Sequence, residues 1–182
     1  MSKEFKSMIF GNKNKFAFEI EQGITEVKGY LKLWINNKSI GDFKKQDEYI
    51  HVISDFKKFD ITYQILYEKE FDKMDVEQIH SYLLAEDLIL SENPEDLEEA
   101  QRRQIYVRFF GLQFDGLCSF NSLYKDGYIT FILWFYKRKK DEYESFKIKL
   151  EDYKVAIDEF TAWFNKNISK NYPSSKQRLP KG

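Results

Sequence analysis

Hydrophobic and polar residues alternate with a period of two along residues 27–35. Valine, glycine, leucine and isoleucine occupy every second position, and the positions between them hold Lys28, Tyr30, Lys32 and Trp34. This pattern predicts a strand with one face on a core and the other partly in water. Asparagine tolerates left-handed backbone angles, so Asn36 and Asn37 predict a tight hairpin turn into residues 38–43.

The same alternation occurs upstream and extends the prediction to an antiparallel meander of three or four strands. Residues 16–20 alternate between large apolar side chains and smaller or charged ones, a pattern typical of a second strand. A short strand is expected to begin at Met8, and Gly11 and Asn12 are expected to turn the chain after it.

The middle of the chain changes to helical spacing. Apolar residues recur at that spacing over residues 49–56, and Gln46 or Asp47 is the expected helix start. Residues 61–67 have a mixed character, so a continued helix and a strand both stay open there.

Two capping patterns predict the next helices. Asp75 and Gln78 match a capping box, in which each side chain bonds the backbone N–H of the other, and the helix is expected to end near Ala85. Asn93 and Pro94 are residues preferred at the cap and in the first turn, so a second short helix is expected to begin there.

The last third of the chain predicts a hairpin, an edge strand and a final helix. Asp126 and Gly127 separate two aromatic-rich runs, which is a strong hairpin signal. Residues 146–150 alternate between apolar residues and lysine, as in an edge strand whose lysines discourage pairing with other chains. Asp152 is expected to cap a helix with an apolar face formed by Tyr153, Ala156, Ile157, Phe160, Trp163 and Phe164.

Together these elements predict a single α+β domain over residues 8–168. Its sheet is mainly antiparallel and consists of the N-terminal meander and the C-terminal hairpin, with helices in the middle and an amphipathic helix at the C-terminal end. Residues 1–7 are expected to be frayed, and residues 169–182, with two prolines and no apolar period, to be disordered. Aromatic residues make up 18% of the chain, so a core of large rings is expected.

Charge and cysteine content narrow the possible partners and compartment. The 29 basic and 30 acidic residues give a net charge of -1, which speaks against a nucleic-acid or anionic-membrane partner. The single cysteine, Cys118, cannot form an internal disulfide, and the first residues lack the apolar run of a signal peptide. A cytoplasmic location is therefore expected.

The sequence contains no pattern that specifies catalysis or a metal site. His51, His80 and Cys118 have no ligand spacing, so we expect structural or exposed histidines and a buried, inert thiol rather than a nucleophile. Asp115 and Asp126 could form an acid/base pair, but aspartate before glycine is ordinary turn chemistry. Phosphate loops and dinucleotide fingerprints are missing too. Neither enzyme activity nor a cofactor is expected.

Two features are candidates for binding another protein. Residues 92–99 either form a solvated helix start that matches the helix dipole or face a basic partner. Their acidic members are Glu92, Glu95, Asp96, Glu98 and Glu99. In the first predicted strand, Tyr30 and Trp34 either form an exposed interface hot spot or, if a helix covers them, belong to the core.

Five short motifs occur in the first third of the chain: MIFGN at 8–12, FAFE at 16–19, GY at 29–30, WIN at 34–36 and IGD at 40–42. Together they resemble the opening of bacterial polymorphic-toxin immunity proteins, specifically the forty-second immunity family. The later hairpin with Trp134 and the closing helix with Phe160 and Trp163 are compatible with that family. Where its turn is expected to have Asn-Gly, this chain has Asn36 and Asn37, which accept the same backbone angles.

The resemblance implies a small cytoplasmic α+β protein that protects a bacterium by binding a cognate toxin, without catalysis and without a cofactor. It names no toxin. Binding of this kind needs a preformed surface of complementary charge, so we expect the acidic residues at 92–99 and an adjacent loop to form the contact. The alternative is a structural or regulatory binding module with a different partner. An enzyme would instead show a pocket with converging carboxylates and a histidine.

Overall fold

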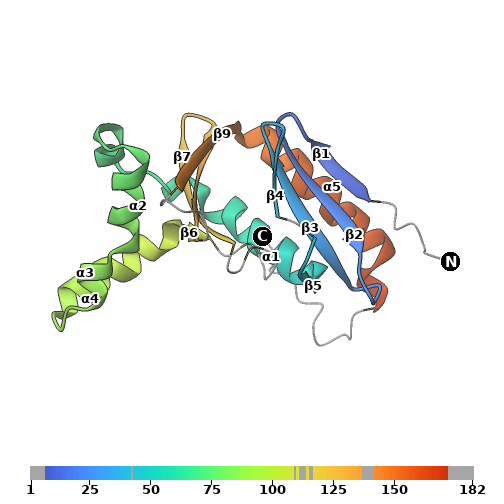
Figure 1. Ribbon diagram of the computed structural model, residues 1–182, viewed down its shortest axis with the longest axis horizontal. Coiled ribbons are helices and arrows are strands. Elements are labelled where there is room, and N and C mark those ends of the chain that lie inside the picture. The colour runs from blue at the N-terminus through green and yellow to red at the C-terminus, as the bar shows by residue number, and fades with distance from the viewer. Residues whose placement is uncertain are drawn as a thin grey trace. The chain divides into compact units, whose positions relative to one another are not determined.

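The computed structural model describes residues 7–41, 43–108, 110, 114, 117–136 and 142–171. Within these residues the chain forms two antiparallel sheets and several helices, which confirms the predicted α+β class (Figure 1). The chain divides into two compact units. The first comprises Met1–Ile61, Phe110–Asp115 and Ile148–Gly182, and the second comprises Thr62–Phe109 and Gly116–Lys147. The single domain over residues 8–168 stays a prediction.

The first unit contains the predicted N-terminal meander. Its strands are β1 (Met8–Asn12), β2 (Phe16–Gln22), β3 (Lys28–Ile35), β4 (Lys38–Ile40) and β5 (Gln46–Glu48). They pair in the order β1-β2-β3-β4, and β5 also pairs with β3. Asn36 and Asn37 both have positive φ, 50° and 66°, which confirms the two-residue turn between β3 and β4.

The predicted turn at Gly11 and Asn12 is wrong. Both residues lie in β1, where Gly11 pairs with Ala17 and Asn12 pairs with Phe16. The chain turns over the next three residues, and the N–H of Lys15 donates to the carbonyl of Asn12 at 2.9 Å. The glycine serves another purpose, because β1 passes close to Ala156 of the last helix there.

Two helices, α1 (Tyr49–Thr62) and α5 (Leu150–Asn167), cover one face of this sheet with aromatic side chains. Figure 1 shows α5 alongside β1 and β2, which it contacts. The ring of Phe18 lies 4.7 Å from that of Phe56 and 5.3 Å from that of Phe160. The hydroxyl of Tyr153 donates to the carbonyl of Phe56 at 2.5 Å. The predicted apolar face of the last helix is confirmed, with Trp163 only half-buried.

Two predicted helix starts are wrong. Gln46 and Asp47 do not begin α1, because they pair with Tyr30 and Gly29 as part of β5. Asp152 does not cap α5, which begins at Leu150 without a side-chain cap.

Residues 61–67, where a helix and a strand were both open, continue as helix as far as residue 65, and Leu66 and Tyr67 belong to neither a helix nor a strand. There α1 runs on to Thr62, and a 3-10 helix follows at Tyr63–Ile65. At the other end of the chain, Ser169–Asn171 forms a 3-10 helix where the tail was expected to begin. The rest of that tail and residues 1–6 lie outside the described residues.

The second unit combines the second sheet with three helices. The strands β6 (Val107–Arg108), β7 (Cys118–Lys125), β8 (Tyr128–Phe135) and β9 (Glu142–Lys149) pair in that order, which puts β9 at an edge as predicted. Asp126 and Gly127 form the predicted hairpin turn with φ of 51° and 81°. The helices are α2 (Val76–Leu84), α3 (Glu86–Ile89) and α4 (Pro94–Arg103), with 3-10 helices at Lys69–Lys73 and Gln104–Tyr106. The capping box of Asp75 and Gln78 is confirmed.

The two histidines have different environments. His80 is buried in the second unit, where its Nδ1 lies 2.6 Å from the side-chain nitrogen of Asn121. Burial lowers the pKa of His80 from its ordinary 6.5, so the neutral imidazole accepts this hydrogen bond. His51 is exposed, and its Nδ1 lies 3.3 Å from Asp47. Cys118 is buried in β7, as expected.

Replacing Gly11 by alanine is expected to lower the free energy of unfolding by about 1–3 kcal/mol, the usual cost of forcing an extra methyl into packed structure. An added Cβ would lie 2.7 Å from the Cβ of Ala156 and closer still to the carbonyl oxygen of Phe16, at a residue whose φ is +92°. Gly127→Ala is the matched control, because its φ is +81° but no atom lies within 4 Å. Urea unfolding measures both variants, and equal losses would contradict the close approach of β1 and α5.

The burial of His80 predicts a pH dependence of stability. Well above pH 6.5, the ordinary pKa of histidine, the imidazole is neutral in both states and contributes no slope. As the pH drops through 6.5, the unfolded chain takes up a proton before the folded protein does, so the free energy of unfolding should decrease with decreasing pH until the lower folded pKa is reached. The slope cannot exceed about 1.4 kcal/mol per pH unit for one proton. Urea unfolding of the wild type and of His80→Gln across this range measures it, and identical slopes would contradict the prediction.

Candidate functional site

The acidic segment at residues 92–99 forms the start of α4 in the second unit. The side chain of Asn93 accepts a hydrogen bond from the N–H of Glu95 at 3.1 Å, and Pro94 occupies the first turn, as predicted. The short helix α3 packs against α4. Ser91, in the connection between them, donates to the carboxylate of Asp96 at 2.6 Å and accepts from the N–H of Asn93 at 3.1 Å. These hydrogen bonds therefore hold the connection between α3 and α4 against the start of α4.

The five acidic side chains are not equivalent. Asp96 is engaged by Ser91, and Glu99 lies between two arginines of its own helix, 2.7 Å from Arg102 and 2.8 Å from Arg103. The hydrogen bonds from these guanidinium groups lower the pKa of Glu99 to about 2. These two carboxylates therefore hold the helix together.

The other three acidic side chains face outward. Glu92, Glu95 and Glu98 are exposed, and their carboxylates make no hydrogen bond or ion pair to other described residues. A partner that approached this side of α4 would meet three carboxylates that no described side chain neutralises.

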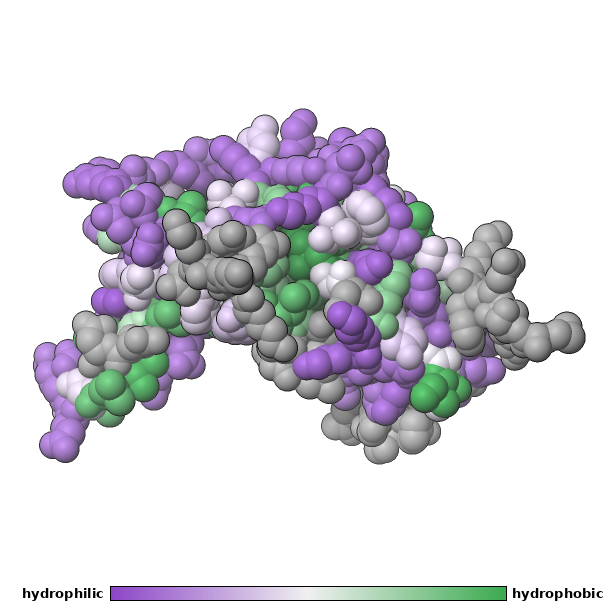
Figure 2. All heavy atoms as spheres, in the orientation of Figure 1, coloured by the Kyte–Doolittle hydropathy of each residue, from purple (hydrophilic) through white to green (hydrophobic). Residues whose placement is uncertain are grey.

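Exposed apolar side chains accompany these carboxylates. Ile89, Leu90 and Leu97 are 46%, 84% and 39% exposed. Figure 2 shows hydrophobic surface gathered over the α3–α4 region, at the lower left of the view. The sequence prediction considered only the charges and missed these residues. Their signal was the Leu-Ile-Leu run at 88–90, directly before the acidic segment.

A polar cluster beneath α4 fixes its C-terminal half. Glu68 accepts hydrogen bonds from Arg102 at 2.7 Å, from Tyr82 at 2.9 Å and from Tyr106 at 3.1 Å. Burial opposes ionisation of Glu68, but these hydrogen bonds outweigh it and lower its pKa. Arg103 adds a bond to the carbonyl of Tyr82 at 2.9 Å and stacks on its ring. The helix is thus a preformed surface, the kind that binds a partner with little rearrangement.

Tyr30 and Trp34 lie on the face of the first sheet opposite the aromatic core, so α1 and α5 do not cover them. Both are half-buried by neighbours on their own face. Trp34 donates to Glu19 at 2.6 Å, and the amine of Lys13 lies 4.1 Å from its ring centre. Tyr30 accepts from Gln46 at 2.6 Å. These two residues are therefore neither buried under a helix nor fully exposed.

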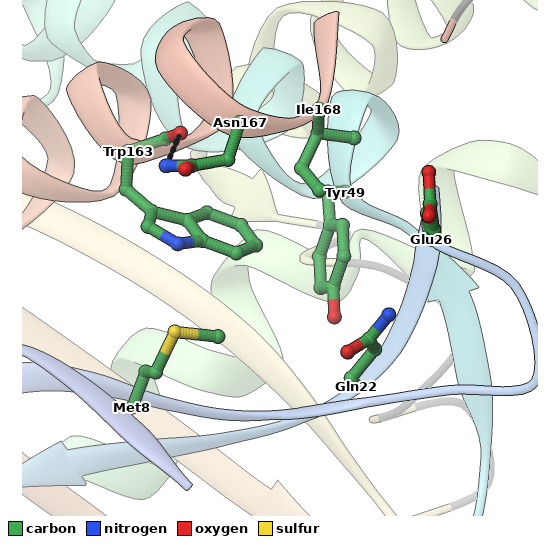
Figure 3. Close-up of a pocket in the computed structure, with 7 residues that line it drawn as sticks. All are labelled: Met8, Gln22, Glu26, Tyr49, Trp163, Asn167 and Ile168. Carbon is green, nitrogen blue, oxygen red and sulfur yellow. Dashed lines mark hydrogen bonds between the residues drawn. The ribbon is translucent and has the colours of Figure 1, made fainter. Parts of the chain in front are cut away.

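A pocket of about 310 Å³ opens in the first unit (Figure 3). The rings of Trp163 and Tyr49 meet edge to face at 5.3 Å in its wall. The lining residues are Met8, Gln22, Glu26, Tyr49, Trp163, Asn167 and Ile168. With a single carboxylate and no histidine, this lining differs from the converging acid and base groups that an enzyme uses.

The remaining candidates for chemistry were an acid/base pair and a metal site. Asp126 lies in the turn between β7 and β8, and Asp115 is outside the described residues, so the predicted pairing of the two carboxylates stays untested. Among the described residues, no three or more His, Cys, Asp or Glu side chains are placed to hold a metal ion. In the same part of the chain, no helix combines the length and the apolar character needed to cross a membrane.

Comparison with known proteins identifies the family. The chain resembles the crystal structure of CdiI from Burkholderia dolosa AUO158 with a TM-score of 0.62 and 13% sequence identity, over 85% of this chain and 99% of that one. At this identity the likeness concerns the fold. No curated protein matches the chain. The model of the family described as immunity protein 42 matches residues 8–163, nearly the span of the resemblance seen in the sequence, and the chain therefore belongs to the immunity protein 42 family.

Proposed function

We propose that this protein neutralises a cognate bacterial toxin by binding it. The observation that carries this proposal is the family match over residues 8–163. The fold it shares with CdiI supports the proposal, and so does a surface in the second unit that is built from tied side chains rather than from a loose loop. The protein would act in the cytoplasm as a non-catalytic inhibitor without a cofactor.

The contact is proposed to involve the acidic start of α4. Glu92, Glu95 and Glu98 would face basic side chains of the toxin, while Asp96 and Glu99 keep the helix in place. Attraction between opposite charges raises the association rate of such pairs, which suits an inhibitor that must capture a toxin before it acts. Tyr30 and Trp34 of the first unit remain a second candidate contact.

Coexpression tests the function directly. Cells that produce the toxin domain encoded next to this protein should survive only when this protein is also made. Toxin domains from unrelated loci should kill in its presence, because recognition depends on one complementary surface. Death with every neighbouring toxin, while the protein accumulates in folded form, would refute the proposal.

Charge reversal tests the contact. The triple variant Glu92→Lys, Glu95→Lys and Glu98→Lys is expected to weaken toxin binding at least tenfold at low salt, and the loss should shrink as salt screens the charges. The control replaces three exposed carboxylates elsewhere, Glu70→Lys, Glu77→Lys and Asp158→Lys, and changes the net charge equally. Titration calorimetry compares the two. Equal losses would show that only net charge matters and would argue against α4.

One further variant, Trp34→Phe, compared with the α4 variant, distinguishes the two candidate surfaces. If α4 is the contact, Trp34→Phe, which removes the donor to Glu19, should leave toxin affinity unchanged within about twofold, because most exchanges outside an interface are nearly neutral. A larger loss in Trp34→Phe than in the α4 variant would assign the contact to the first sheet.

A further inference from the structure

The α3–α4 tip, defined by Ile89, Leu90, Glu92, Glu95, Leu97 and Glu98, combines apolar and acidic side chains on one exposed region. A single exposed leucine on a protein surface is ordinary. Three large apolar side chains are exposed within residues 89–97, one of them by 84%, in the region where Figure 2 shows hydrophobic surface. Exposed apolar surface of this kind marks interaction sites.

The fold holds these apolar side chains outward. The N–H of Ile89 donates to the carbonyl of Ala85 at 2.9 Å, and Ala85 itself adopts a left-handed conformation with φ of 50°. The N–H of Ser91 donates to the carbonyl of Leu88 at 3.1 Å. Leu97 lies in the first turns of α4, where its N–H donates to the carbonyl of Asn93 at 3.2 Å. Backbone bonds thus fix the chain on both sides of Leu90.

From this geometry we infer that Ile89, Leu90 and Leu97 form the anchoring centre of the toxin contact, an inference that rests on the proposed function. The occupant is an apolar depression on the toxin that is bordered by lysine or arginine side chains. Those cations would face Glu92, Glu95 and Glu98, which are exposed in the same α3–α4 tip. An apolar centre within a charged rim is the usual anatomy of a specific protein interface.

The charges at the tip select this occupant over two others. A second copy of the chain that paired tip to tip would bring its own carboxylates against these three, and like charges brought together in an interface cost several kcal/mol. An anionic lipid surface would be repelled for the same reason. A basic protein surface is the partner whose charge complements the tip.

The two kinds of residue contribute to different rate constants. Carboxylates at the rim act over a distance and raise the association rate, and salt weakens their effect. Apolar side chains act only after contact, when their surface leaves water, so they set the dissociation rate. If Leu90 anchors the toxin, its replacement changes the dissociation rate. If Leu90 has only a structural role, its replacement leaves that rate unchanged.

The test measures binding kinetics with the toxin domain encoded next to this protein as the probe. The variant Ile89→Ala, Leu90→Ala and Leu97→Ala should raise the dissociation rate at least tenfold and leave the association rate within about twofold. The variant Glu92→Gln, Glu95→Gln and Glu98→Gln should lower the association rate and flatten its salt dependence. The control Ile24→Ala, Ile65→Ala and Val155→Ala removes side chains that are 91%, 61% and 52% exposed elsewhere and should change neither rate.

The outcomes separate the inference from the function on which it rests. If the wild-type protein does not bind the neighbouring toxin, the proposed function fails and the inference fails with it. If it binds, and the alanine variant of the tip dissociates at the wild-type rate, only the inference is overturned. Sedimentation of the free protein tests whether a second copy of the chain occupies the tip. A dimer that is lost in the alanine variant of the tip would assign the tip to a second copy and overturn the inference.

Discussion

The burial of aromatic rings between one sheet face and two helices is the constraint on which the first unit depends. Phe18 of β2 meets Phe56 of α1 and Phe160 of α5 within 5.3 Å, so the spacing of sheet and helices follows from the size of the rings. Rings of this kind bury a large apolar area with few torsions to fix. Because the phenylalanines of β2 face the helices, the opposite side of the sheet can carry charge, as Lys32 and Glu19 do in paired positions.

Much of this fold could be predicted because its signals are local. A period of two, a pair of asparagines and a capping box act within a few residues, and β3, its turn and α2 formed as expected. The errors arose where contacts with segments distant in the sequence determine the local structure. Asp47 looks like a helix start but pairs with Gly29 in a sheet, and no neighbour of Asp47 in the sequence encodes that register. At Gly11, a nearby helix rather than a turn required the glycine.

The sequence indicated where the candidate site lies but did not show which of its side chains are exposed. Five acidic residues indicated a charged surface, yet only the structure separates those that face outward from those that hold the helix. The pairing of Glu99 with Arg102 and Arg103 follows helical spacing and could have been read from the sequence. The link from Arg102 to Glu68 spans 34 positions and could not. Folding therefore decides which carboxylates stay exposed and which are used within the protein.

The exposure of Leu90 has a consequence for how the family can diversify. A side chain that is 84% exposed contributes little to the stability of its own protein, so its replacement is nearly neutral for folding. The hydrogen bonds that set the backbone beside it use main-chain atoms and Ser91, and none of them involves the side chain at position 90. Under the proposed anchoring role of Leu90, mutational drift at this position would exchange one recognition specificity for another while the scaffold stays intact.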